Sequence, residues 1–224
     1  MTAIATAFVG NSFIIGADGR RTDSKTGETT EIAQKVFCFE SDQIRLAFAW
    51  TGTTQAADGN GPVWDLIAAT HQNLPFAAQL AKAGFHSFIS EFCNRLANTL
   101  PICMNGLPTD ELARVLMVGY FQGQPFTLQV QVLYPATIRM IYPSGIHIPA
   151  QIHKTVFSGG ESMYPPYADK QPQNTVEAIA FVRGYLRDCV ESSNPDCAGI
   201  GGHVHIAELT PEGCKWIESP QISN

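Results

Sequence analysis

Short stretches of alternating apolar and polar residues fill the first third of the chain, and this two-residue period is typical of half-buried strands. Four stretches carry it: Thr2–Val9, Phe13–Ile15, Lys35–Phe39 and Ile44–Trp50. The turn residues Gly10-Asn11-Ser12 lie between the first two, and Ser41-Asp42-Gln43 lie between the last two. The pattern therefore predicts two antiparallel hairpins, separated by a polar loop from Thr22 to Glu31.

The period changes to three or four residues in the middle of the chain, which indicates amphipathic helices over 63–74 and 76–100. Gly84 interrupts the second of these, and Asn174 followed by Glu177 is an N-cap signal for a third helix over 175–192. The remaining apolar stretches predict strands: Arg114–Phe121, Thr127–Leu133, Ile138–Tyr142, Lys154–Phe157, His203–Leu209 and a last one around Trp216-Ile217.

The order of these elements is strands, two helices, strands, one helix and strands, without the regular alternation of a parallel α/β fold. Neither a repeat period nor a linker divides the chain. We therefore expect one α+β domain over residues 1–224, with its helices packed on antiparallel sheets.

The composition is that of a globular protein, with 45% hydrophobic and 15% charged residues among 224. A net charge of -6 gives no electrostatic reason to expect nucleic acid or an anionic membrane as a partner. No apolar run reaches the length of a membrane span, and the N-terminus lacks the pattern of a secretion signal. We expect a cytoplasmic protein.

Six cysteines are scattered without a Cys-x-x-Cys pair or zinc-ligand spacing: Cys38, Cys93, Cys103, Cys189, Cys197 and Cys214. In a reducing compartment we expect such residues to be buried, unreactive thiols. His203 and His205 flank one residue of a predicted strand, and without a third ligand we expect them to be ordinary strand residues. The sequence therefore implies neither a metal nor another cofactor.

The residues that carry the most chemistry are Thr2 and, sixteen positions later, Asp18. If Met1 is removed, Thr2 has a nucleophilic hydroxyl and a free α-amine that can accept its proton. A nearby lysine ammonium would lower the pKa of both groups, a carboxylate would hold that lysine, and backbone amides would bind the oxyanion. Lys35, Asp18 and the strand break at Thr51-Gly52 are the candidates for these three roles.

The segment Ala17-Asp18-Gly19-Arg20-Arg21-Thr22, at this interval from Thr2, resembles the opening of proteasome β-type and HslV-like N-terminal-nucleophile hydrolases. Three later segments also resemble this family: Lys35-Val36-Phe37, Ala49-Trp50-Thr51-Gly52 and Phe157-Ser158-Gly159-Gly160. The first begins with the family's catalytic lysine, the second matches the strand end that donates the oxyanion-hole amide, and the third contains the serine beside the nucleophile. The resemblance covers nearly the whole chain.

This resemblance implies a four-layer αββα sandwich and a threonine-type peptidase without a cofactor. Its catalytic residues would be Thr2, Asp18, Lys35 and Ser158, with Thr51 and Gly52 at the oxyanion hole. The family also implies a homo-oligomeric ring that acts on a peptide or an unfolded protein. Any ATPase partner would be a separate chain, because the sequence has no Gly-x-x-x-x-Gly-Lys-Ser/Thr motif. The position of Thr2 directly after Met1 suits removal of the methionine. This arrangement, with no propeptide before Thr2, is closer to the HslV-type peptidase than to subunits that cleave themselves.

Two alternatives share much of this pattern. A non-peptidase amidase would use the same nucleophile with another substrate pocket, and a structural ring subunit would keep the fold without the chemistry. The family's Asp-x-x-Ser-Gly segment stands here as Asp196-Cys197-Ala198-Gly199-Ile200-Gly201-Gly202. Either Asp196 aligns and Gly199 replaces the serine, or the glycines align and both polar groups are absent.

Overall fold

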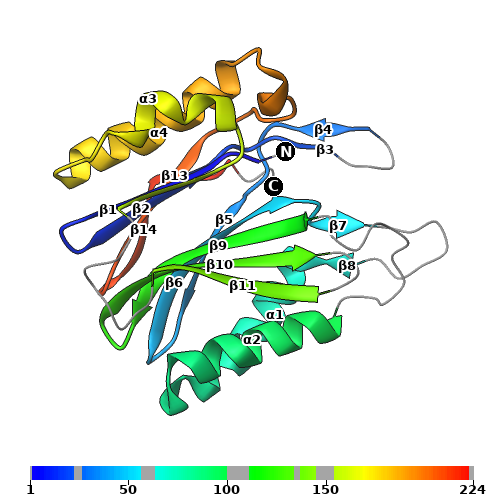
Figure 1. Cartoon of the computed structure of the whole chain (residues 1–224), viewed down its shortest axis with the longest axis vertical. Coiled ribbons are helices and arrows are strands. Elements are labelled where there is room, and N and C mark those ends of the chain that lie inside the picture. The colour runs from blue at the N-terminus through cyan, green and yellow to red at the C-terminus, as the bar shows by residue number, and fades with distance from the viewer. Residues whose placement is uncertain are drawn as a thin grey trace.

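Two five-stranded antiparallel sheets form the centre of the protein (Figure 1). The computed structural model describes residues 2–22, 27–56, 64–99, 111–133, 137–144 and 154–221. The first sheet, in the order β12-β1-β2-β13-β14, consists of β1 (Ile4–Val9), β2 (Ser12–Ala17), β12 (Thr155–Ser158), β13 (His205–Thr210) and β14 (Gly213–Glu218). The second, in the order β11-β10-β9-β6-β5, consists of β5 (Val36–Glu40), β6 (Ile44–Gly52), β9 (Glu111–Phe121), β10 (Gln124–Leu133) and β11 (Thr137–Ser144). The predicted α+β class and both predicted hairpins are confirmed.

Helices flank the two sheets. They are α1 (Leu66–Gln79), α2 (Phe85–Thr99), α3 (Pro165–Ala168) and α4 (Thr175–Glu191), with the 3-10 turns η1 (Leu80–Ala83), η3 (Glu161–Met163) and η4 (Pro195–Cys197). Four two-residue strands complete the description: β3 (Arg21–Thr22), β4 (Thr29–Thr30), β7 (Gln55–Ala56) and β8 (Trp64–Asp65). Asn174 caps α4 as predicted, because its side chain accepts a hydrogen bond from the amide of Glu177 at 3.0 Å. No helix within the described ranges is long and apolar enough to cross a membrane.

The predicted boundary between the first two helices is wrong. α1 continues through Pro75 to Gln79, and the chain breaks instead at Gly84, whose φ of +119° is accessible to glycine. The helix starts at Leu66 because Asp65 Oδ1 accepts hydrogen bonds from two first-turn amides, both at 2.9 Å. Burial of the helix face around Pro75 offsets the hydrogen bond that proline cannot donate. Positions 63 and 100 of the predicted helices lie outside the described residues.

Three apolar cores fix the helices and sheets against one another. α4 packs on the first sheet through residues that include Leu186, and α1 and α2 pack on the second sheet through residues that include Phe92. The third core lies between the sheets and contains Ile15, Val118 and Leu209. Each such side chain contributes roughly 1.5–3 kcal/mol when it is fully buried. Figure 1 shows α3 and α4 beyond one sheet and α1 and α2 beyond the other.

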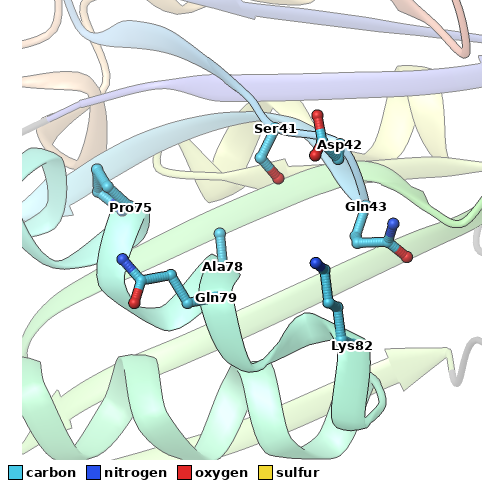
Figure 2. Close-up of a pocket in the computed structure, with 7 residues that line it drawn as sticks. All are labelled: Ser41, Asp42, Gln43, Pro75, Ala78, Gln79 and Lys82. Carbon is cyan, nitrogen blue, oxygen red and sulfur yellow. The ribbon is translucent and has the colours of Figure 1, made fainter.

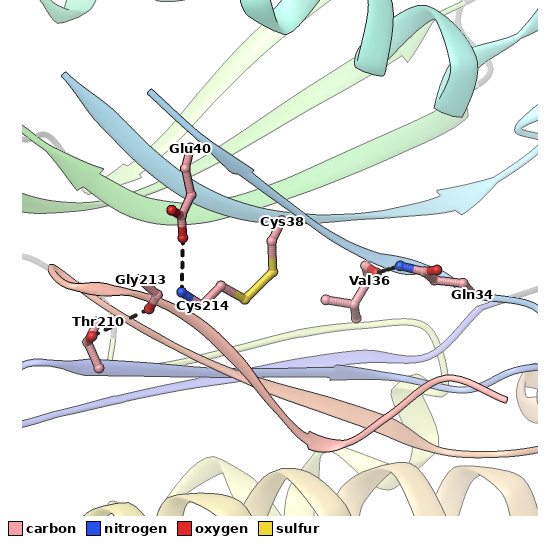
Figure 3. The surroundings of a disulfide bond; sticks show 7 residues. All are labelled: Gln34, Val36, Cys38, Glu40, Thr210, Gly213 and Cys214. Carbon is pink, nitrogen blue, oxygen red and sulfur yellow. Dashed lines mark hydrogen bonds between the residues drawn. A yellow bond between two sulfur atoms is a disulfide. The ribbon is translucent and has the colours of Figure 1, made fainter. Parts of the chain in front are cut away.

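A disulfide bond joins the edges of the two sheets (Figure 3). Cys38 on β5 is bonded to Cys214 on β14, with 6.6 Å between their Cα atoms. The expectation of free thiols is therefore wrong for these two, and their separation of 176 residues leaves no local signal in the sequence. Three other cysteines are free and buried, namely Cys93, Cys189 and Cys197, whereas Cys103 lies outside the described residues.

Candidate active site

Thr2 lies two residues before β1. The start of β1 is paired on one side with the end of β2 and on the other side with the end of β12. Ile4 is paired with Ala17 on β2 and with Ser158 on β12, so the ladder starts at Ile4 and not at Thr2 as predicted. Thr2 is 6% exposed, and its carbonyl oxygen accepts a hydrogen bond from Thr51 Oγ1 at 3.3 Å. The two sheets therefore meet at Thr2, because Thr51 belongs to β6 of the second sheet.

Asp18 is fully buried directly after β2, and four donors converge on its carboxylate. Oδ1 accepts a hydrogen bond from the Ala3 amide at 2.9 Å. Oδ2 accepts one from Lys35 Nζ at 2.9 Å and two from the amides of Gly201 and Arg20, at 3.1 and 3.2 Å. Hydrogen bonds to a charged acceptor are about twice as strong as neutral ones. Asp18 thus connects the peptide bond that follows Thr2 to the ammonium of Lys35.

Lys35 is 8% exposed and lies directly before β5. Burial lowers the pKa of its ammonium below the ordinary value for lysine, and the salt bridge with Asp18 opposes this effect. The charges of Arg20 and Arg21 lower the pKa further. The Lys35 ammonium is therefore a buried positive charge that gives up its proton more readily than the ammonium of a surface lysine.

The Ser158-Gly159 segment forms the other side of the Thr2 environment. Ser158 ends β12 and is buried. Gly159 has a φ of +77°, and a Cβ atom added there would lie 2.1 Å from the Thr2 carbonyl oxygen, so only glycine fits. The hydroxyl of the buried Tyr185 donates a hydrogen bond to the Gly159 carbonyl and holds this segment in place.

Thr51 and Gly52 end β6 beside the site. They are paired with Arg114 and Ala113 on β9. Gly52 has a φ of +88°, and a Cβ atom at this position would lie 2.5 Å from the Leu112 carbonyl oxygen. The predicted break at Thr51-Gly52 is therefore wrong, because β6 continues through Gly52, and the Thr51 hydroxyl on this continuation reaches the Thr2 carbonyl.

Asp196 lies on η4 and is held by Ser162 rather than by a residue of the site. Its carboxylate oxygens accept hydrogen bonds from the Ser162 amide at 2.6 Å and from the Ser162 hydroxyl at 2.8 Å. These two bonds lower the pKa of the Asp196 carboxyl below its usual range. Of the glycines that follow, Gly201 is the one that contacts the site, through its amide bond to Asp18.

His205 belongs to the same cluster, although the sequence suggested an ordinary strand residue. It is 1% exposed, and its Nε2 accepts hydrogen bonds from the amides of Lys35 at 3.0 Å and Val36 at 3.1 Å. Burial lowers the pKa of the ring to about 4. His203 lies before β13 and not within a strand, and its Nε2 faces the Ser219 carbonyl at 2.9 Å. Because the contacts of His205 are with residues far away in sequence, only its position after Gly201-Gly202 could have drawn attention to it.

A pocket of about 340 Å³ lies away from this cluster, between the β5–β6 turn and the end of α1 (Figure 2). It is lined by Ser41, Asp42, Gln43, Pro75, Ala78, Gln79 and Lys82. The Ser41 hydroxyl is already engaged in its own turn through Ile44. The pocket includes none of the residues around Thr2. Within the described ranges, no group of three or more His, Cys, Asp or Glu side chains is placed to hold a metal ion.

No protein-family model matches the sequence, and no curated protein matches it. Solved structures do match the fold over nearly the whole chain. Anbu (ancestral beta-subunit) from Yersinia bercovieri is 11% identical with a TM-score of 0.57, and a mutant of Anbu from Hyphomicrobium sp. strain MC1 is 9% identical with a TM-score of 0.58. Each alignment covers 98% of this chain and 88% of the other.

These matches correct the family resemblance inferred from the sequence. The similar structures are of Anbu and not of a proteasome β-type or HslV-like protein, so that assignment is wrong. At about one identical residue in ten, the likeness establishes the fold alone. The roles of the individual side chains must therefore be argued from the site itself.

Proposed function

We propose that the chain is a proteasome-like threonine-type peptidase of the N-terminal-nucleophile class. In this proposal residues 1–224 form one domain, and its two sheets and flanking helices are the four layers of an αββα sandwich. The packing of α4 on one sheet and of α1 and α2 on the other supports this arrangement, as does the fold similarity to Anbu. Thr2 becomes the terminal residue once Met1, which lies outside the described residues, is removed.

The observation that carries the proposal is the position of the Asp18 carboxylate. It binds the amide of Ala3 with one oxygen and the ammonium of Lys35 with the other. A buried ion pair without a role is costly to maintain, because both ions lose their hydration. Here the pair is bonded to the Ala3 amide, one peptide bond from Thr2, and the Thr2 hydroxyl would need a nearby positive charge.

The reaction then proceeds by acyl transfer. The Thr2 hydroxyl attacks the carbonyl carbon of the scissile amide, and its proton passes to the α-amine of the same residue, directly or through water. The Lys35 ammonium lowers the pKa of both groups, so the amine is unprotonated and the hydroxyl is easier to ionise. The C–N bond breaks as the leaving amine takes the proton. Water then hydrolyses the ester on Thr2 and regenerates the hydroxyl.

The surrounding segments supply the remaining functions in this proposal. Backbone donors at Thr51 and Gly52 bind the oxygen that becomes negative in the tetrahedral intermediate. Ser158 assists the proton transfer at the Thr2 amine. Its burial beside Gly159, which is pressed against the Thr2 carbonyl, supports this placement.

The substrate in this proposal is a peptide or an unfolded protein, and the chain works as one subunit of a homo-oligomeric ring in the cytoplasm. The similar protein from Yersinia bercovieri is named an ancestral beta-subunit, which supports a subunit role. A separate ATPase chain would unfold protein substrates for such a ring.

Intact mass and activity test the proposal together. We expect the purified chain to have lost Met1 and to gain one adduct at Thr2 with a peptide epoxyketone, which reacts with both hydroxyl and amine. Thr2→Ala should lower peptide turnover at least about 1000-fold, whereas Thr2→Ser retains a measurable rate. Thr6→Ala, a matched change on β1, should stay within about twofold of the parent chain.

Three outcomes separate the alternatives. Full turnover by Thr2→Ala would refute the nucleophile assignment. Acylation of Thr2 by small amides without peptide turnover would identify an amidase. A chain that keeps Met1 after exposure to active methionine aminopeptidase and forms no adduct would be a structural subunit.

A further inference from the structure

We infer that His205 is a positioning residue for this site, which holds the backbone of Lys35 and Val36 so that the Lys35 ammonium meets Asp18. The inference rests on the proposed function, since it concerns the lysine that tunes Thr2. His205 itself touches neither Thr2 nor the path of the reacting atoms in this assignment. It acts through Lys35.

The geometry around the His205 ring is unusual for a strand residue. Two successive amides, those of Lys35 and Val36, donate to the same Nε2 atom at 3.0 and 3.1 Å. In an extended strand, successive amides point in opposite directions. Their convergence on one atom therefore requires a bend at the entrance to β5, of the kind that elsewhere forms anion-binding nests.

The fold supplies the ring and the carboxylate side by side. His205 begins β13, and its Cα partner across the sheet is Ala17, the residue before Asp18. Lys35 is consequently held at both ends of the residue, with its amide on His205 and its Nζ on Asp18. Trp216 on β14 lies with its ring centroid 6.2 Å from the imidazole and limits the ring's movement.

Only an unprotonated ring nitrogen can accept these two hydrogen bonds. The ring must therefore carry its proton on Nδ1, with the Nε2 lone pair directed at β5. A proton on Nε2 would face two N–H groups without an acceptor, and the start of β5 would have to move. Lys35 would then lose the backbone support that directs its side chain at Asp18.

Two substitutions distinguish this role from simple packing. His205→Phe keeps a ring but removes the acceptor, and we expect kcat for a peptide substrate to fall about 10- to 100-fold while KM changes less than about twofold. His205→Gln places an oxygen near the Nε2 position and should recover kcat to within about fivefold of the parent chain. His86→Phe is the matched control, because that side chain is exposed on α2, which packs on the outer face of the second sheet, and it should leave kcat unchanged.

Nitrogen NMR provides a readout that does not depend on turnover. In the full-length chain, and equally in Thr2→Ala, we expect the His205 Nε2 resonance of an unprotonated acceptor and strongly shifted amide resonances for Lys35 and Val36. A protonated Nε2, or an unshifted amide pair, would overturn the inference even if His205→Phe does not fold. If Thr2→Ala keeps full turnover while these resonances are as expected, the proposed function fails and the His205 contact stands. Wild-type kcat in His205→Phe would refute the positioning role alone.

Discussion

The two ends of β5 join the same two sheets by opposite chemical means. At its start, Lys35 and Val36 are held by Asp18 and His205 of the first sheet through a buried ion pair and two amide bonds. Toward its other end, Cys38 is covalently bonded to Cys214 (Figure 3). The ion pair and the disulfide therefore have different tasks. The ionisable link carries charges and binds Asp18, whereas the covalent link at Cys38, three residues after Lys35, restrains the edge strands.

The largest effect is expected from Lys35→Met, which removes the charge at the ionisable end. We expect peptide turnover to fall roughly 100-fold or more, because the Thr2 amine and hydroxyl lose the ammonium that lowers their pKa. Stability should fall by about 3 kcal/mol, since Asp18 stays buried without its counter-ion. Steady-state kinetics and urea unfolding measure the two effects, and Lys82→Met, at an exposed lysine on η1, should change neither.

Low pH should weaken the contacts at the start of β5, because it protonates His205. Its pKa of about 4 in the folded chain lies below the ordinary 6.5, so the unfolded chain binds more protons between these values. Stability from this group is complete above pH 6.5 and is lost as the pH falls toward 4, by about 3 kcal/mol in all. The charged and titratable groups that face the ring are Lys35 and His203. Urea unfolding of the parent chain and His205→Gln across this range measures the effect, and equal pH slopes in the two chains would contradict the prediction.

Removal of the covalent end should affect stability without affecting the site. We expect the double substitution of Cys38 and Cys214 by serine to cost about 2 kcal/mol, because the bond closes a long loop in the unfolded chain. Denaturant unfolding with and without reductant measures it. A tenfold loss of turnover in the folded variant would show that the two ends are coupled.

The smallest effect is expected from Glu40→Gln at the end of β5. Its carboxylate accepts a hydrogen bond from the Cys214 amide at 3.1 Å in an exposed position, so a neutral amide oxygen can replace it. We expect a change in unfolding free energy below about 1 kcal/mol and no change in turnover. A larger loss on calorimetry would mean that this contact, and not the disulfide, holds β14 to β5.

The contrast between the ends of β5 also explains what the sequence could predict. The hairpin of β1 and β2 and the Asn174 cap depend on neighbouring residues, and both were predicted. The pairing of Asp18 with Lys35 could also be predicted, because a threonine nucleophile needs such a charge and the charge needs a carboxylate. The fold class followed from the order of the elements.

The missed features are contacts between distant parts of the chain. His205 reaches Val36 across 169 residues, and Cys38 reaches Cys214 across 176. Neither has a local pattern, because the partners meet only when the sheets stack. The α1 boundary was missed for a related reason, since burial of the helix outweighed the usual effect of Pro75.

The disulfide bond between β5 and β14 also affects how two copies of the chain could associate through their sheets. These are outer strands of their respective sheets, and tying them together closes that flank of the protein. In the two five-stranded sheets, β11 and β12 are then the outer strands that no such bond ties down. An unpaired strand edge is a template for pairing with another chain. A neighbouring copy that extended either sheet by strand pairing would therefore pair with β11 or β12.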